Sequence, residues 1–233
     1  FHFVATEESK QRVIRMGERE EFVWVTGAPS LDNITEGLPE TREEVCQQLG
    51  LKKAVPFILV LFHPVVAEAQ DAFRQTQELI NTLSDIAIIG GRHIIWLDPN
   101  ADAGSHDIIS AISTVSGSSW RRITHLARNT YLAALKHCDV LVGNSSSGIV
   151  EAASFGTPVV NIGSRQNLRQ RNINTIDCVA QQANIKSAIV RALERGRMSA
   201  MNIYGNGTAG SAIVKLLAQV PVGRNVPEKF NTY

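Results

Sequence analysis

The sequence predicts an α/β fold, a Rossmann-like parallel sheet with helices on both faces. Short apolar runs alternate along the chain with longer segments of helical spacing, which is the pattern of β–α–β units joined by right-handed crossovers. The run at 56–62 is apolar on both faces, as expected of a central parallel strand covered by helices on each side. Polar loops follow several of these runs directly, and in open parallel sheets ligands lie at such strand ends.

The first 34 residues are expected to form a strand at 1–5, a helix at 7–16 closed by Gly17, and a short strand at 22–26. Because the chain opens on Phe1 within a strand already in progress, we expect that part of the protein precedes it.

The remaining elements follow from capping and periodicity. Thr41 and Glu44 have the spacing of a capping box, so a helix should run from there to Gly50. Further helices are expected at 65–83, 105–115, 129–137, 149–155, 181–195 and 211–220. Strands are expected at 56–62, 93–97, 123–126, 139–142, 158–162 and 173–178.

The composition argues against several classes of protein. The chain has 233 residues and a formal net charge of +1, with no long run of one sign, so it suggests no nucleic-acid or membrane-surface partner. No apolar run approaches the roughly 18 residues of a membrane span. Cys46, Cys138 and Cys178 are widely spaced and the histidines lack ligand spacing, so we expect no disulfide framework, no metal site and a cytoplasmic location.

The stretch at 141–153 carries the strongest chemical signal. An apolar, β-prone segment leads into small polar residues at 144–147, and helical spacing follows. Small residues let backbone N–H groups approach a phosphate, and a helix start leaves unpaired donors there. Glu151 lies about one turn into this helix, where a carboxylate could accept hydrogen bonds from a ribose diol. The stretch therefore indicates a nucleotide diphosphate site.

Other interpretations of the same residues fit less well or stay open. A serine-rich turn before a helix is commonly an N-cap without a ligand, and this alternative stays open. A Walker loop needs a Gly-Lys-Ser/Thr ending that is absent here, and a nucleophile elbow needs glycine where Asn144 precedes Ser146. Residues 205–210 match Gly-x-Gly-x-x-Gly, but no βαβ unit follows, so we assign them to a turn before the last helix.

Four segments directly follow strands and should meet at one edge of the sheet: His63, Asn100, 143–147 and 163–165. A guanidinium pairs well with a diphosphate, which favours a binding role for Arg165, although loop arginines are commonly just solvated. His63 could contact an anion or a leaving group, although a lone histidine is more often structural.

At this point a family resemblance becomes visible. Residues 143–152 read GNSSSGIVEA, 155–166 read FGTPVVNIGSRQ, and 99–104 read PNADAG. With His63-Pro64 and the ending from Tyr204 to Phe230, this order resembles the UDP-N-acetylglucosamine 2-epimerase family along essentially the whole chain. The Asn-Ser-Ser form is similar to the hydrolysing branch, which serves sialic and legionaminic acid synthesis. One departure is Leu168, where the family commonly has glycine.

The resemblance implies a glycosyltransferase-B arrangement, two Rossmann-like halves with the active site between them, of which this chain is the carboxyl-terminal half. Residues 1–34 would then be the end of the amino-terminal half and the hinge, 35–203 the UDP-binding domain, and 204–233 a closing helix and tail. The implied partners are UDP and a UDP-sugar, with no cofactor, and the full-length protein is expected to be a homo-oligomer.

The resemblance also implies roles for individual residues. His63 would be catalytic, near the reacting sugar and its leaving phosphate. The expected UDP-binding residues are Asn100, Ser145, Ser146, Glu151 and Arg165.

The implied enzyme removes the C2 proton of a UDP-sugar, expels UDP to leave a glycal, and adds water to give the free manno-configured sugar. The carboxylates used for proton transfer would lie upstream, so the chain alone is expected to bind UDP but to be inactive. Two rivals remain: a glycosyltransferase of the same fold, and a non-catalytic UDP-sugar-binding module.

Overall fold

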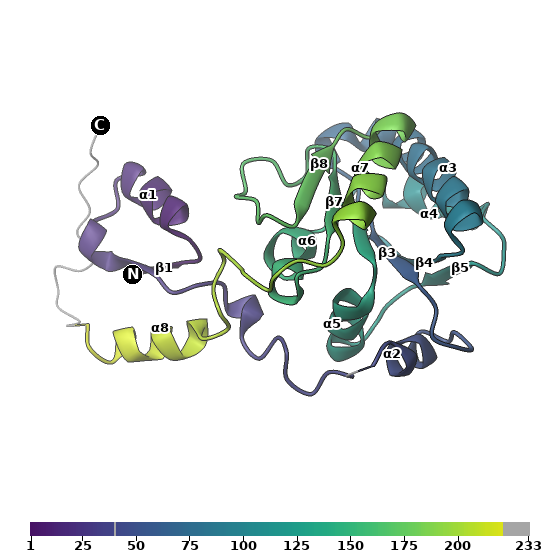
Figure 1. Cartoon of the computed structure of the whole chain (residues 1–233). Helices are drawn as coiled ribbons and strands as arrows, with labels where there is room; N and C mark the ends of the chain where they lie inside the picture. Colours follow the sequence, from purple (N-terminus) through teal and green to yellow (C-terminus); the bar gives the residue numbers. More distant parts are fainter. Residues whose placement is uncertain (40, 221–233) are drawn as a thin grey trace. The chain divides into compact units, whose positions relative to one another are not determined.

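The computed structural model describes residues 1–39 and 41–220, and these fall into two compact units. One unit contains residues 1–34 together with the segment from 202 onward, and the other contains 35–201. Figure 1 labels the helices and strands of both. In the described part of the chain, no helix is both long enough and apolar enough to span a bilayer.

The larger unit is built on six parallel strands in the order β5-β4-β3-β6-β7-β8. The strands are β3 (Phe57–Leu61), β4 (His93–Leu97), β5 (Trp120–Ile123), β6 (Val140–Gly143), β7 (Val159–Ile162) and β8 (Thr175–Cys178). From β3 the chain first builds outward through β4 and β5, and then returns to add β6 on the other side of β3. The boundary between β3 and β6 is therefore the topological switch point, where open parallel sheets bind ligands.

Helices cover both faces of this sheet, which confirms the predicted fold class (Figure 1). On one face lie α3 (Ala72–Gly90), α4 (Ser105–Ser113) and α7 (Gln182–Arg195), whose apolar sides form one core with the strands. On the other face lie α2 (Arg42–Gln48), α5 (Arg128–His137) and α6 (Ser146–Val150). A Cβ added to Gly148 of α6 would approach Val159 to 2.9 Å, so this helix packs directly on the sheet.

The sequence prediction was wrong about the position of one strand. We expected a strand at 123–126, but β5 is Trp120–Ile123, and 124–126 form a loop. The strand begins earlier because Trp120 stacks on Trp96 of β4, with ring centroids 6.4 Å apart. The charged pair Arg121-Arg122 is tolerated because β5 is an edge strand, where charged side chains can reach solvent.

Three expected helices also differ in extent. The helix expected at 65–83 is a 3₁₀ segment, η3 (Val66–Asp71), followed by α3, which continues to Gly90. The helix expected at 149–155 is α6 followed by the 3₁₀ segment η4 (Ala152–Phe155). The helix expected at 211–220 is α8 (Ala209–Leu217).

The smaller unit combines the two ends of the described chain. It contains β1 (His2–Val4), α1 (Glu7–Arg15), η1 (Glu20–Phe22), β2 (Val23–Val25), η2 (Pro29–Leu31) and α8. β1 and β2 pair in parallel, and the rings of Phe3 and Trp24 stack across them at 5.6 Å.

The Gly-x-Gly-x-x-Gly segment at 205–210 has the structural role that was predicted for it, a turn before the last helix. A Cβ on Gly207 would lie 2.9 Å from the Leu31 carbonyl oxygen, so the turn packs tightly against the chain near η2. Thr208 gives α8 no side-chain cap, and Asp32 supplies it instead, with carboxylate oxygens that accept from Ala209 N (2.8 Å) and Gly210 N (2.6 Å). The first N–H groups of α8 are thus already occupied by a carboxylate.

This cap generates a prediction for Asp32→Ala. The substitution removes two charge-assisted hydrogen bonds, each contributing about 1.5–3 kcal/mol, so the amides of Ala209 and Gly210 should exchange with deuterium at least about tenfold faster. Asp32→Asn is the matched control, because it keeps one acceptor oxygen and should show a smaller increase. Unchanged exchange in Asp32→Ala would contradict the capping role.

Candidate functional site

The candidate site lies at the carboxyl ends of β3, β6 and β7, around the switch point. Asn144 directly follows β6 and is the residue that joins these strand ends. Its side-chain oxygen accepts from the His63 backbone N–H at 2.7 Å, and its side-chain nitrogen donates to the His63 carbonyl oxygen at 2.8 Å. Only 1% of Asn144 is exposed. Its amide therefore fixes the backbone of His63, the second residue after β3.

Gly143 allows the backbone at the end of β6 to lie close to the backbone at the end of β3. Its φ of 141° lies in the region that favours glycine, and a Cβ there would lie 1.9 Å from the Leu61 carbonyl oxygen. The same carbonyl oxygen accepts from Asn144 N at 3.0 Å. A side chain at position 143 would push the two strand ends apart.

The backbone carbonyl of Asn144 holds the loop that follows β7. It accepts from Arg165 Nη1 at 3.2 Å and from Gln166 Nε2 at 2.9 Å. Burial lowers the pKa of the Arg165 guanidinium, and the charge of Asp102 opposes that effect. Arg165 is thus a partly desolvated cation, which is a suitable partner for a phosphate.

His63 is held in one protonation state. Its Nδ1 accepts from the backbone N–H of Asn100 at 3.1 Å, so the ring proton of the neutral form is on Nε2. Burial, followed by the positive charge of Arg165, lowers the pKa of His63 to about 4, while Asp102 acts in the opposite direction. Near pH 7 this histidine is neutral and offers an Nε2–H donor.

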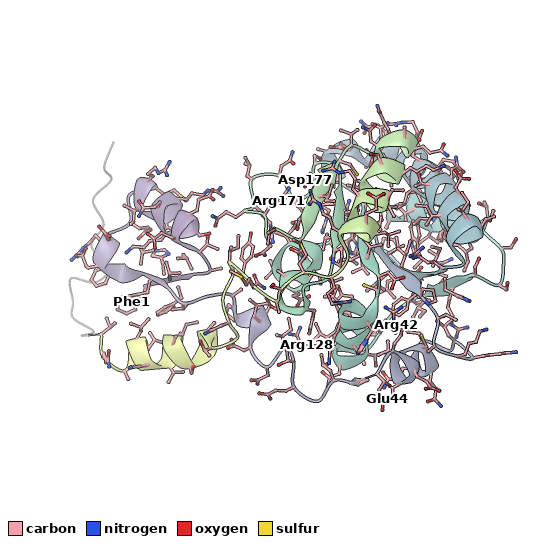
Figure 2. The ribbon with its side chains drawn as sticks, viewed as in Figure 1. Phe1, Arg42, Glu44, Arg128, Arg171 and Asp177 are labelled. Carbon is pink, nitrogen blue, oxygen red and sulfur yellow. The ribbon has the colours of Figure 1, made fainter. Side chains whose placement is uncertain are left out.

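A second set of contacts surrounds Glu151, at the end of α6. Tyr131 donates its hydroxyl to Ser147 Oγ, and Ser147 Oγ donates to Glu151 Oε2, both at 2.5 Å. Burial raises the pKa of Tyr131, which keeps it a donor in this chain. Arg128 of α5, labelled in Figure 2, lies 3.6 Å from Glu151 Oε1. Glu151 is therefore an oriented carboxylate with acceptor capacity left on both oxygens.

The predicted residues thus form two groups. His63, Asn100 and Arg165 belong to the group linked through Asn144, and Asn100 Nδ2 also donates to Asp102 at 2.5 Å. The second group is Glu151 with its partners on α5 and α6. Ser145 and Ser146, half-buried at the start of α6, lie between Asn144 and Ser147 in the chain.

A cavity of about 260 Å³ opens beside this second group. Its walls come from the ends of β3 and β4, from the loop at 124–126, and from α5 and α6, including Tyr131, Ser145 and Ser147. The loop at 124–126 was not predicted, because these residues were expected to form a strand. Residues 144–147 were expected only as a turn that approaches a phosphate, so the side-chain contacts of Asn144 and Ser147 were not predicted, and Asp102 was given no role.

The loop after β7 bends at Leu168, which has a φ of 67°. A left-handed conformation costs a residue with a Cβ about 1–2 kcal/mol relative to glycine, which accounts for glycine as the common residue here in the family that the sequence resembles. The side chain is 83% exposed, so little packing offsets this cost.

Among the described residues, no three His, Cys, Asp or Glu side chains are arranged to hold a metal ion. The three cysteines are free thiols.

A family model described as UDP-N-acetylglucosamine 2-epimerase matches residues 1–218. A Legionella pneumophila protein named UDP-N,N'-diacetylbacillosamine 2-epimerase (hydrolyzing) is 40% identical over 100% of this chain and 61% of its own length. The Neisseria meningitidis UDP-N-acetylglucosamine 2-epimerase is 28% identical over 99% of this chain and 59% of its own length. The chain thus spans about three fifths of these relatives.

Solved structures support the fold. The Neisseria meningitidis UDP-GlcNAc 2-epimerase bound to UDP-GlcNAc superposes with a TM-score of 0.76 at 16% identity, covering 94% of this chain and 62% of that one. The Methanocaldococcus jannaschii enzyme in complex with UDP-GlcNAc and UDP gives a TM-score of 0.69 at 18% identity, covering 93% and 60%. These likenesses confirm the Rossmann-like, glycosyltransferase-B-type fold class.

The site geometry predicts the behaviour of Asn144→Asp. A carboxylate keeps the acceptor for His63 N–H but cannot donate to the His63 carbonyl, and its charge favours a protonated imidazole. The pKa of His63 should therefore rise by about 1 or more, measured by NMR titration of its ring protons. Asn184→Asp, on the exposed surface of α7, makes the same change of net charge far from these bonds in the chain and should leave the titration unchanged. An unaltered pKa in Asn144→Asp would contradict the proximity of the two groups.

Proposed function

This chain belongs to the UDP-N-acetylglucosamine 2-epimerase family, and from that premise we propose that it is the UDP-binding half of a hydrolysing UDP-sugar 2-epimerase. The observation that carries the proposal is the assembly at the switch point, where Asn144 holds both His63 and Arg165. A cation and a neutral donor on one fixed frame suit a leaving diphosphate.

The nucleoside would occupy the cavity bounded by Tyr131 and the loop at 124–126. Glu151, oriented through Ser147, would accept hydrogen bonds from the ribose hydroxyls. The diphosphate would lie at Ser145 and Ser146, within reach of Arg165 and Asn100. Support for this order comes from the chain itself, since α6 connects the cavity wall to the residues at the end of β6.

In the proposed reaction a base removes the C2 proton, the C1–O bond to UDP breaks, and a glycal remains. Water then adds across the double bond of the glycal to give the free manno-configured sugar, so UDP-sugar and water become UDP and sugar. His63 would donate its Nε2–H to the departing phosphate, and Arg165 would compensate the charge that develops there. His63 is not the base in this scheme, because its Nδ1 is already an acceptor for Asn100 N–H.

The free energies involved indicate that this half needs further groups to catalyse the reaction. One hydrogen bond to a charged group contributes about 1.5–3 kcal/mol, whereas enzymes lower barriers by roughly 8–23 kcal/mol. We propose that the carboxylates for proton transfer belong to a part of the protein outside residues 1–233. A glycosyltransferase or a non-catalytic binding module remains the alternative, and release of free manno-configured sugar by the full-length protein would exclude both.

Calorimetric titration of this chain with UDP tests the nucleotide assignment, with AMP as the control ligand. We expect saturable binding of UDP and at least about tenfold weaker binding of AMP, because AMP lacks the second phosphate and would place a purine instead of uracil in the cavity, whereas its ribose offers Glu151 the same hydroxyls. Equal affinity for the two nucleotides, or no binding of either, would count against the proposal.

The role of Glu151 has its own test. Glu151→Gln should weaken UDP about tenfold more than it weakens 2′,3′-dideoxy-UDP, because a charged hydrogen bond of about 1.5–3 kcal/mol is lost only where the ribose hydroxyls exist. Each ligand serves as the reference for the other, so a general disturbance of the Ser147 contact cancels. Equal losses for both ligands would remove Glu151 from the ribose site.

A further inference from the structure

The loop that follows β7 carries Arg165, and its shape decides where this cation lies. We call residues 163–171 the Arg165 loop. Arg165 Nη1 donates to the Asn144 carbonyl oxygen at 3.2 Å, which is longer than the most common N–H···O distance of about 2.9–3.0 Å. A long hydrogen bond constrains a flexible side chain weakly. The position of the guanidinium therefore depends on the backbone that carries it.

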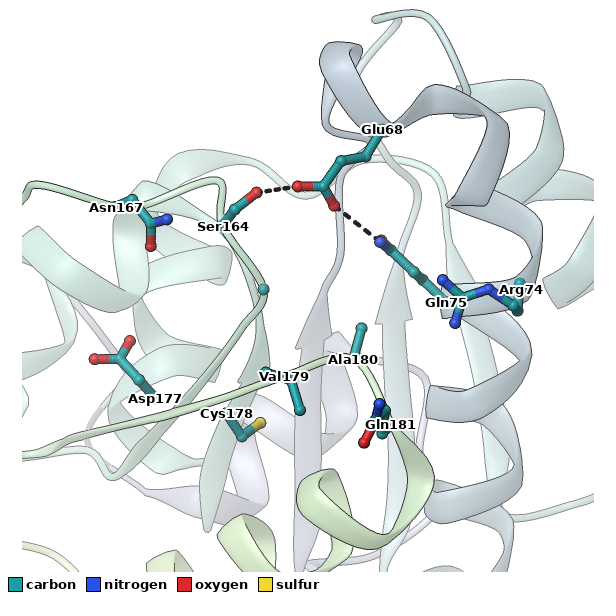
Figure 3. Close-up of a pocket in the computed structure, with 11 residues that line it drawn as sticks. Glu68, Arg74, Gln75, Ser164, Asn167, Asp177, Cys178, Val179, Ala180 and Gln181 are labelled. Atoms are coloured by element: carbon teal, nitrogen blue, oxygen red, sulfur yellow. Dashed lines mark hydrogen bonds between the residues drawn. The ribbon is translucent and has the colours of Figure 1, made fainter.

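The backbone of the Arg165 loop is strained at one residue and borders a cavity. Leu168 has a φ of 67°, and residues 167–169 are exposed. The cavity measures about 590 Å³, and Ser164, Asn167 and Asp177 are among its walls (Figure 3). The loop thus keeps a conformation that Leu168 disfavours while bordering open space, so contacts other than core packing must hold it.

Polar contacts hold the Arg165 loop at both ends. At its start, Ser164 Oγ donates to Glu68 of η3, as a dashed line in Figure 3 marks. At its end, Arg171 turns back on the loop, and its Nη1 donates to the carbonyl oxygens of Gln166 at 2.8 Å and Arg169 at 2.7 Å. One guanidinium thus ties the residue next to Arg165 to a residue three positions further along.

Arg171 is itself anchored to the sheet. Its Nε donates to both carboxylate oxygens of Asp177, at 3.0 Å each, and the two residues lie side by side in Figure 2. Asp177 is on β8, and its Oδ1 also accepts from Nδ2 of Asn161, its partner in the pairing of β7 with β8, at 2.6 Å. Asn161 is buried. A continuous set of contacts therefore runs from the sheet through Arg171 to the backbone of Gln166.

From these contacts we propose that Arg171, anchored by Asp177, is a positioning residue that keeps Arg165 where it can meet a leaving diphosphate. The part of this inference that concerns the ligand rests on the proposed function. Arg171 acts through the loop backbone and not through contact with the ligand. Arginine suits this task because its planar fork of donors can bind a carboxylate and two carbonyl oxygens at once, whereas lysine is a compact point charge.

The first measurement needs no ligand. If Arg171→Met releases the loop, the Arg165 guanidinium should move away from His63. The pKa of His63 should then rise, because the charge of Arg165 is one of the causes that lower it. We expect NMR titration of the His63 ring protons to show an upward shift, in the same direction as in Arg165→Ala. In Arg165→Ala/Arg171→Met the titration should match that of Arg165→Ala.

Arg169→Met is the matched control. It removes a charge from the same loop but leaves the contacts of Arg171 in place, because Arg171 binds the backbone carbonyl of residue 169. Its shift measures the loss of one loop charge alone. Arg171→Lys keeps the charge and removes the fork, so it should also raise the pKa of His63, and it replaces Arg171→Met if that variant does not fold. A shift in Arg171→Met no larger than in Arg169→Met, with none in Arg171→Lys, would overturn the inference.

The second measurement, calorimetric titration of the whole chain with UDP, connects the loop to the diphosphate. Arg171→Met should bind UDP at least about threefold more weakly than the wild-type chain, and Arg171→Lys should lose less. If the wild-type chain binds UDP and Arg171→Met binds it equally well, the positioning inference fails alone. If the wild-type chain does not bind UDP, the proposed function fails, and the titration of His63 still decides whether Arg171 holds Arg165.

Discussion

The structure of the site depends on one constraint, the distance between the ends of β3 and β6. These neighbouring strands start the two halves of the sheet, which the chain builds in opposite directions. Gly143 allows the strand ends to approach, and Asn144 then pairs with both the N–H and the carbonyl of His63. A buried amide can satisfy both groups because it has a donor and an acceptor. A carboxylate would leave the His63 carbonyl unpaired and an alkyl group would leave both groups unpaired, at a cost of about 1–3 kcal/mol for each unpaired group.

The contacts of Asn144 also determine the electrostatics of the site, because they place Arg165 near His63. Arg165 is held at the Asn144 carbonyl, and its positive charge adds to the effect of burial in keeping His63 neutral. Asp102 opposes that effect on His63 and supports the charged form of Arg165. The site therefore holds the Arg165 guanidinium cation with the neutral His63 imidazole beside it. Both groups can stabilise negative charge on a ligand without a prior change in their protonation state.

Local signals predicted most of the fold and part of the site. The buried strands at 57–61 and 140–143 were recognisable because parallel central strands are apolar throughout. The serine turn was recognisable because small polar residues at 144–147 end the second apolar run. The edge strand β5 was misplaced because its charged residues lack that signature and its position is set by contact with Trp96. The roles of Asn144 and Asp102 were not predictable, because each acts on residues at least 20 positions away through contacts that only the folded sheet creates.

The contacts to the nucleoside and the contacts to the leaving phosphate have different energetic effects in the proposed reaction. Contacts to the nucleoside are equally strong before and during the reaction, so they improve binding without lowering the barrier to chemistry. Arg165 and the His63 Nε2–H differ, because charge builds on the leaving phosphate only as the C1–O bond breaks, and their interaction grows with it. In the proposed enzyme the nucleoside cavity therefore holds the substrate, and His63 and Arg165, both bonded to Asn144, stabilise the leaving group.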